Sequence, residues 1–229
     1  MRIGGFQSFS LNEFPDRISA VVFCQGCNFR CPYCHNPELV DPARYTTSWP
    51  EDRVMDELAA RRGRLQGVVI TGGEPALQED LETFIRKVRG LGFAVKLDTN
   101  GSNPDALERL LSAGLLDHVG LDVKAPLREY AALTRAEIPP NTITRSIFTV
   151  LASGVDHEMR TTWLPSLLPR ADLLEIAGMV RGCRLWVIQR FVPSKALDPA
   201  VLSERSPDDV QLAEIKTAIE ALGIRCLVR

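Results

Sequence analysis

Short apolar segments rich in β-branched residues alternate with helical segments along most of this 229-residue chain. In the helical segment 80–92, Leu81, Phe84, Ile85 and Val88 recur at intervals of three and four residues. The segments expected to be strands are residues 18–24, 67–71, 94–99, 118–124, 157–164 and 184–191. Six strand-then-helix units in a row predict a mostly parallel α/β sheet with right-handed crossovers. The periodicity leaves open whether this sheet is a doubly wound layer or a curved partial barrel.

A single domain is expected over residues 1–229, because no linker, repeat or low-complexity segment interrupts the series. Within it we expect an N-terminal extension over 1–17 and a barrel core over 18–191 that contains a cysteine loop at 24–37. A C-terminal helix and strand are expected over 192–229. A chain of this length can bury one large core.

Charge and hydropathy argue against several classes of partner. The chain has 27 basic and 29 acidic residues, a formal net charge of −2, so it offers no polybasic surface for nucleic acid or a membrane. Its first residues lack the basic and apolar regions of a signal peptide. No stretch of the sequence approaches the roughly 18 consecutive apolar residues that a membrane-spanning helix needs. We therefore expect a cytoplasmic protein, where clustered cysteines are more often metal ligands or catalytic thiols than disulfides.

Polar residues gather at the same end of the predicted strand–helix units. They are TGGEP at 71–75, DTNG at 98–101, LDVK at 121–124, and Arg160 with Thr162 in the fifth strand. In parallel sheets and barrels, functional sites are built at the carboxyl ends of the strands. Asp98 and Asp122 could instead cap the helices that follow them. Their shared position at one rim favours a functional role.

Four of the six cysteines lie within eleven residues. Cys27, Cys31 and Cys34 have the spacing C-x3-C-x2-C, and Cys24 adds a C-x2-C in front. Soft thiolates in such a pattern suit zinc or an iron–sulfur cluster. A structural zinc site usually has two C-x2-C pairs well apart in sequence, and a redox dithiol would use Cys24 with Cys27. The spacing favours an iron–sulfur cluster and leaves the other two open.

Two motifs together resemble those of a known family. The segment CNFRCPYC at 27–34 resembles the signature of radical S-adenosylmethionine (SAM) enzymes, and TGGEP resembles their second motif. More narrowly, the chain is similar to activating enzymes of glycyl-radical enzymes. The similar segments are residues 3–40, TGGEPALQ, KLDTNGSNP, LDVKAP and MRTTWLP. The resemblance covers nearly the whole chain and is strongest to the branch that activates anaerobic ribonucleoside-triphosphate reductase. It implies a partial (β/α)6 barrel of the radical SAM type.

The resemblance also implies cofactors and the residues that hold them. Cys27, Cys31 and Cys34 would bind one [4Fe–4S] cluster, whose fourth iron would take the amino and carboxylate groups of SAM. The backbone and carboxylate at Gly72, Gly73 and Glu74 would receive the SAM ammonium. Further expected SAM contacts are Tyr33, His35, Asp98, Thr99, Asn100, Asp122, Lys124 and Arg160. A monovalent cation is expected near Asp98 and Asp122, and the ribose contact within 189–193 is left open.

The implied reaction needs no acid or base from the protein. The reduced cluster would cleave SAM, and the resulting 5′-deoxyadenosyl radical would take a hydrogen atom from a glycine of the partner enzyme. A flavodoxin or ferredoxin would supply the electron. The 37 residues between Cys34 and Gly72 contain no cysteine, which predicts a single cluster. Cys24 is expected not to be a ligand, and Cys183 and Cys226 are expected to be buried small side chains.

Three readings are compatible with these motifs. The leading one is an activase of the anaerobic reductase, although activases of pyruvate formate-lyase and other glycyl-radical enzymes share most of the motifs. The second is a radical SAM enzyme that acts on a small molecule, in the manner of 7-carboxy-7-deazaguanine synthase. The third is a zinc-binding module without catalytic activity.

Overall fold

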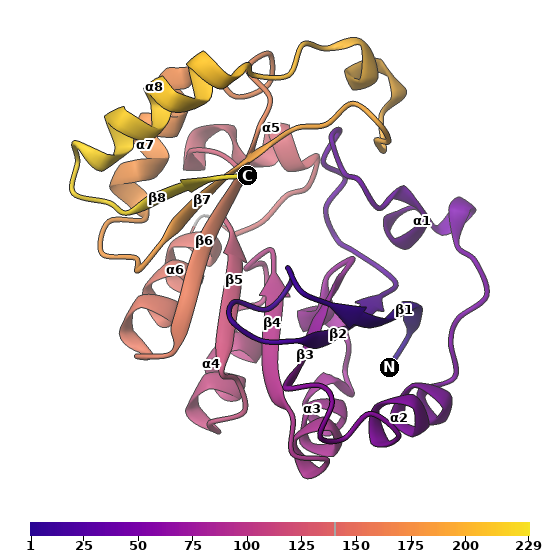
Figure 1. Ribbon diagram of the computed structural model, residues 1–229. Helices are drawn as coiled ribbons and strands as arrows, with labels where there is room; N and C mark the ends of the chain where they lie inside the picture. Colours follow the sequence, from indigo (N-terminus) through magenta and orange to yellow (C-terminus); the bar gives the residue numbers. More distant parts are fainter. Residues whose placement is uncertain (140) are drawn as a thin grey trace.

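The computed structural model describes residues 1–139 and 141–229, and its centre is one eight-stranded sheet with the strands in chain order. The strands are β1 Ile3–Ser10, β2 Ser19–Cys24, β3 Gly67–Gly72, β4 Ala94–Thr99, β5 His118–Asp122, β6 Asp156–Trp163, β7 Trp186–Arg190 and β8 Cys226–Val228. From β2 to β8 every neighbouring pair is parallel, and β1 pairs antiparallel with β2. The sheet curves without pairing β1 to β8 in the described residues (Figure 1). The predicted partial barrel is confirmed.

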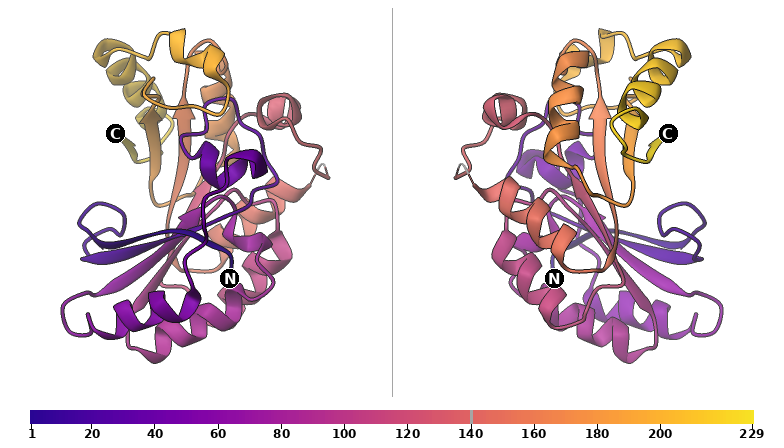
Figure 2. Two further views of the ribbon diagram at one scale, coloured as in Figure 1. Left: turned by 90° about the vertical axis from the view of Figure 1, so that its right-hand side faces the viewer. Right: turned by 90° about the vertical axis from the view of Figure 1, so that its left-hand side faces the viewer.

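Helices connect the parallel strands and cover the outer face of the sheet. They are α1 Pro37–Val40, α2 Glu51–Ala59, α3 Leu81–Gly90, α4 Pro104–Ser112, α5 Tyr130–Thr134, α6 Thr142–Ala152, α7 Arg170–Met179 and α8 Asp209–Glu220. The helices α3, α4 and α6 lie on one side of the sheet, and the loop between β1 and β2 projects on the other (Figure 2). Helix α3 buries Leu81, Phe84, Ile85 and Val88, the residues whose spacing predicted it. No helix in the described part of the chain is long and apolar enough to cross a membrane.

The N-terminal region is more ordered than the sequence suggested. Residues 1–17 were expected as an extension, and the structure places β1 there, paired along Phe6 and Gln7 with Val22 and Val21. Its sequence IGGFQSFS has two glycines and no clear alternation of apolar residues. A strand of this composition is stabilised by its pairing with β2, which a local pattern does not report.

Alternate residues of the strands face opposite sides of the sheet. One set joins the helices in a large hydrophobic cluster; its members include Val22, Ile70, Leu97, Leu121 and Ile188. On the other, concave face a smaller cluster of Phe14, Val21 and Val69 fills one part. The remainder of that face buries charged residues, among them Lys96, Asp98, Glu158 and Arg160. The concave face is therefore the polar side of the sheet, and it leads to the carboxyl ends of the strands.

Candidate functional site

A pocket lies at the carboxyl ends of β2 to β6. The residues that line it are Cys27, Phe29, Cys31, Tyr33, Cys34, His35, Asn36, Val40, Thr71, Gly72, Gly73, Asp98, Thr99, Asn100, Asp122, Lys124, Arg160 and Thr162. All the residues predicted for the site are in this set except Glu74. Phe29 and Asn36 were not predicted, although their place inside the cysteine loop was a signal that could have identified them. The structure thus brings together segments from five different strand ends.

The cysteine loop after β2 is held by the protein's own hydrogen bonds. Its first turn is made by Gly26, which has φ +105° and donates its N–H to Leu39 O over 2.7 Å. Farther along, the N–H of Arg30 donates to Thr134 O over 2.7 Å, and its guanidinium donates to Cys27 O over 2.7 Å. These contacts fix the path of the loop between the first and second thiols. The Sγ of Cys27 accepts from Phe29 N at 3.4 Å.

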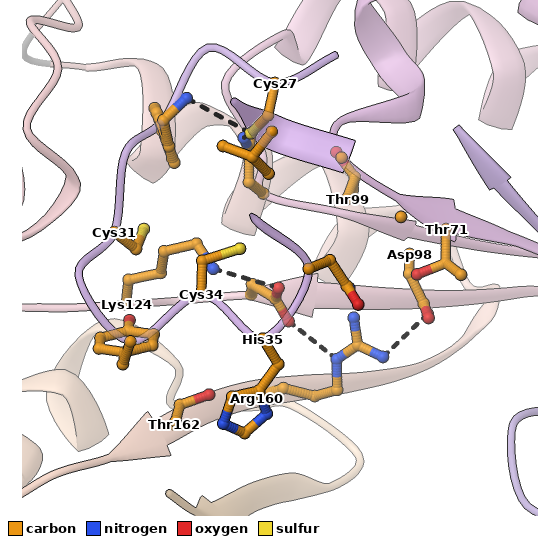
Figure 3. Close-up of a pocket in the computed structure, with 18 residues that line it drawn as sticks. Cys27, Cys31, Cys34, His35, Thr71, Asp98, Thr99, Lys124, Arg160 and Thr162 are labelled. Atoms are coloured by element: carbon orange, nitrogen blue, oxygen red, sulfur yellow. Dashed lines mark hydrogen bonds and ion pairs between the residues drawn. The ribbon is translucent and has the colours of Figure 1, made fainter. Parts of the chain in front are cut away.

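The three predicted ligand thiols share the pocket wall and come from this one loop (Figure 3). Burial, followed by the charge of Glu74, raises the pKa of Cys27 to about 12, and burial also raises the pKa of Cys31 and Cys34. In the absence of a metal these thiols are protonated at neutral pH. Since a metal binds the thiolate, loading of this site must release protons.

The residues of the pocket fit an iron–sulfur cluster by their chemistry. Three thiols from one loop line the pocket, and their soft sulfur atoms suit such a cluster. The hydroxyl of Tyr33, between the second and third thiols in sequence, is buried in the described structure without a hydrogen-bond partner. It is therefore free to donate to a bound group.

Cys24 stands apart from the other three. It is fully buried at the end of β2 and, unlike Cys27, Cys31 and Cys34, does not line the pocket. Burial raises the pKa of its thiol far above the ordinary value. This geometry agrees with the expectation that Cys24 is not a ligand.

The glycines at the end of β3, Gly72 and Gly73, bring that strand end against the base of the cysteine loop. Gly72 has φ +110°, and a Cβ atom there would lie 2.6 Å from Cys24 N. A Cβ on Gly73 would lie 2.1 Å from Gly26 O. The N–H of Gly73 donates to Cys24 O and the N–H of Glu74 to Gly26 O, both over 2.8 Å. Glycine is required here because the two backbones touch.

Glu74 lies behind the pocket wall. Its carboxylate accepts hydrogen bonds from Thr99 Oγ1 at 2.6 Å, Asn100 N at 2.6 Å and Ala76 N at 2.9 Å. Burial raises the pKa of this carboxyl to about 7, against the opposing effect of those donors. Glu74 therefore ties the end of β3 to the end of β4. Any contact of its carboxylate with SAM stays a prediction.

Ionic side chains form a chain across the concave face below the pocket (Figure 3). Arg160 Nη1 lies 3.0 Å from Asp98 Oδ1, and Arg160 Nε donates to Asp122 Oδ1 over 2.8 Å. Asp98 Oδ1 is also 3.1 Å from Lys96 Nζ, and Asp122 Oδ2 is 3.3 Å from Lys124 Nζ. Although burial opposes ionisation, Arg160 and Lys96 lower the pKa of Asp98 to about 2. For Asp122, burial is likewise outweighed by Arg160 and Lys124, and its pKa is lowered.

His35 lies at the rim of this pocket. Its ring packs against that of Phe191, with ring centroids 5.5 Å apart. Phe191 belongs to the segment 189–193, in which the ribose contact was left open. That segment therefore reaches the pocket rim next to His35, a predicted SAM contact.

Comparison with known proteins shows similarity along nearly the whole chain. A family model described as the radical SAM superfamily matches residues 21–177. A Methanocaldococcus jannaschii protein, provisionally named a glycyl-radical enzyme activating enzyme, is 33% identical over 219 residues, 93% of this chain and 89% of that protein. A Pyrococcus horikoshii protein provisionally named a GTP 3′,8-cyclase is 32% identical over 103 residues, which are 45% of this chain and 33% of that protein.

Solved structures share the fold at low sequence identity. The crystal structure of Streptococcus suis SuiB bound to S-adenosylmethionine has a TM-score of 0.68 and 11% identity, and the match covers 91% of this chain and 51% of that one. The structure of anSMEcpe with bound AdoMet has a TM-score of 0.63 and 14% identity, with 90% and 61% covered. The chain thus spans about half to two thirds of these solved proteins.

Proposed function

Because the chain belongs to the radical SAM superfamily, as its family match over residues 21–177 shows, we propose that it forms a glycyl radical on anaerobic ribonucleoside-triphosphate reductase. The family implies a [4Fe–4S] cluster and SAM as cofactors. The proposal places the chain among activating enzymes because its match to such a relative runs end to end, whereas the cyclase match covers 45% of the chain. The choice of the reductase rests on the sequence motifs alone.

The observation that carries the proposal is the shared pocket of Cys27, Cys31 and Cys34 with the backbone of Gly72 and Gly73. We assign the three thiols to the cluster and the glycine backbone to the SAM ammonium. When bound, the cluster supplies the electron that cleaves SAM, and the hydrogen atom of a partner glycine is then abstracted. One open iron position remains for SAM because three thiols serve four irons.

The rest of the pocket orients SAM and keeps water out. Lys124 and Arg160 give the floor positive charge, which suits the SAM carboxylate. Tyr33, His35, Thr99 and Asn100 are assigned to the remaining contacts. The partner glycine must reach within about 3–3.5 Å of the reacting carbon before cleavage, because the reactive species has to be used where it forms.

Several finer features are part of the proposal. The electron donor is a flavodoxin or ferredoxin, the chain acts as one domain, and it acts in the cytoplasm without a nucleic-acid or membrane partner. The monovalent cation that the resemblance predicted near Asp98 and Asp122 is not part of the proposal, because Arg160 lies between the two carboxylates.

Anaerobic reconstitution tests the proposal. The reduced protein is given SAM and the reductase, and 5′-deoxyadenosine and the glycyl EPR doublet are measured together. We expect both products, in about equal amounts. 5′-Deoxyadenosine without a doublet overturns the assignment to the reductase, and a doublet on pyruvate formate-lyase instead identifies that partner. Repeated turnover of a metabolite without a protein partner supports a small-molecule enzyme, and one zinc per chain without iron–sulfur absorption excludes radical chemistry.

A further inference from the structure

The guanidinium of Arg160 lies between the two aspartates near which the family resemblance places a monovalent cation. Its Nη1 is 3.0 Å from Asp98 Oδ1 and its Nε is 2.8 Å from Asp122 Oδ1. A single planar cation therefore contacts both carboxylates directly. We propose that Arg160 takes the place of the bound ion, so that this site holds its two aspartates together without sodium or potassium.

The charges around Arg160 include no carboxylate without a cation. The ion pairs join three carboxylates, Asp98, Asp122 and Glu158, to four cations, Lys96, Lys124, Arg160 and the half-exposed Arg229. Lys96 and Glu158 are nearly inaccessible, with side chains 2% and 1% exposed. An alkali ion would add an uncompensated positive charge next to a guanidinium in a region of low dielectric, which is unfavourable. Asp98 Oδ1 would have to accept that ion while two nitrogens lie within 3.1 Å.

A glycine on the intervening strand makes this contact possible. Arg160 is on β6 and Asp98 on β4, so the guanidinium must cross β5, where Gly120 pairs with Asp98 on one side and Glu158 on the other. A Cβ atom on Gly120 would lie 2.5 Å from Asp98 Oδ1 and 3.0 Å from both Arg160 Cζ and Nη1. Any side chain at 120 would therefore push the guanidinium away from Asp98. Gly120 is the residue that selects an internal cation over a bound one.

Arg160 retains the electrostatic role that an ion would have. It lines the pocket together with Lys124, Asp98 and Asp122, so its charge faces the cavity assigned to SAM. Unlike a bound ion it is attached to β6 and cannot be lost by dilution. Arg160 is thus a positioning residue: it holds the two carboxylates and neutralises their charge at the pocket floor.

The test compares salts at constant ionic strength. The anaerobically reconstituted protein is placed in about 0.15 M sodium, potassium, lithium or choline chloride, and Tm and the Kd for SAM are measured. For the wild type we expect the same Tm and Kd in all four salts. For Arg160→Ala we expect a lower Tm and at least a tenfold weaker Kd in choline. Sodium or potassium chloride should raise the Tm of that variant by about 5 °C or more over choline chloride, because an ion that binds the folded state stabilises it.

A matched control and a second variant keep the test decisive. Arg145→Ala removes an exposed arginine that pairs with Asp105 and Glu108, and its Tm should respond equally to all salts. If Arg160→Ala does not fold, Gly120→Ala is the second variant. It keeps the Arg160 side chain but moves its guanidinium away from Asp98, so its Tm should show a smaller response to alkali ions. A saturable rise of the wild-type Tm with one alkali ion over choline overturns the proposal. So does an Arg160→Ala protein that folds and responds to no ion.

The inference deepens the proposed function, since its SAM measurement rests on that assignment. The Tm measurement needs neither turnover nor a partner. A failure of the glycyl-radical assay and a failure of the ion test are therefore distinguishable.

Discussion

The two faces of the curved sheet are built from neighbouring residues of the same strands, yet they bury opposite kinds of side chain. On β4, Leu97 joins the hydrophobic cluster under the helices, while Lys96 and Asp98 on either side of it enter the ionic chain of the concave face. All three are buried. Burial alone therefore does not separate stability from function in this protein. The outer face contributes apolar area, and the concave face fixes charges around a pocket.

The cysteines sharpen this contrast most strongly. Cys24 ends β2 and does not line the pocket, whereas Cys27 in the loop that follows does. We expect Cys27→Ser to abolish the cluster and SAM cleavage, because a ligand is lost, and Cys24→Ser to keep both. Iron content, visible absorption and 5′-deoxyadenosine formation after anaerobic reconstitution measure the difference. Equal loss in both variants would mean that a place in the pocket wall does not decide which thiol is a ligand.

An outer-face substitution should affect stability and leave the pocket intact. Leu97 is fully buried, so Leu97→Ala should lower the free energy of unfolding by about 2–5 kcal/mol through lost contacts and a cavity. Urea denaturation measures this, and the Kd for SAM of the folded protein should stay within about twofold of wild type. Leu97→Met, which nearly conserves volume, is the control and should cost less than about 1.5 kcal/mol. A large change in the Kd would contradict the separation of the two faces.

Asp98, next to Leu97 on the concave face, should make the stability of the protein depend on pH. Arg160 and Lys96 overcome burial and hold the pKa of Asp98 at about 2, below its unfolded value, so its stabilisation is complete above about pH 4 and is lost as pH falls toward 2. This loss amounts to about 2 kcal/mol. Asp98→Asn should lack that part of the acid-induced decrease. Unfolding free energies of both proteins, stripped of iron and measured between pH 5 and 2, check the slope; identical slopes would contradict the assignment.

A surface ion pair gives the lower limit of these effects. Arg145 pairs with Asp105 and Glu108, and all three side chains are about half exposed or more. Water and salt screen such pairs, so Arg145→Ala should leave the urea midpoint of unfolding nearly unchanged. Urea denaturation in low and high salt measures it. A loss of stability as large as that of Asp98→Asn would show that exposed pairs here behave like the buried chain.

The sequence was sufficient for the architecture because the outer face follows local patterns. The apolar spacing of Leu81, Phe84, Ile85 and Val88 predicted α3, and the β-branched runs predicted the parallel strands. The strand β1 was missed because its pairing with β2 stabilises it and its own composition does not. The site residues were predicted from motifs at strand ends, and nearly all of them line one pocket.

Contacts within the site could not be predicted in the same way. The place of the Glu74 carboxylate depends on three donors, two of them on a different strand end. The crossing of Arg160 over Gly120 to Asp98 depends on the register of three strands. Neither relation leaves a periodic signal in the sequence. Each appears only when strands far apart in the chain are placed side by side.

The contact between the glycines at the end of β3 and the base of the cysteine loop has a consequence for protein engineering. Gly72 and Gly73 touch the backbone at Cys24 and Gly26, and two N–H groups of the second motif donate to carbonyls of the first. A designer who transplants the cysteine loop alone into another parallel sheet would leave those two carbonyls without donors. A portable unit therefore needs both segments, residues 24–34 and 72–74, on adjacent parallel strands, together with acceptors in place of Leu39 O and Thr134 O.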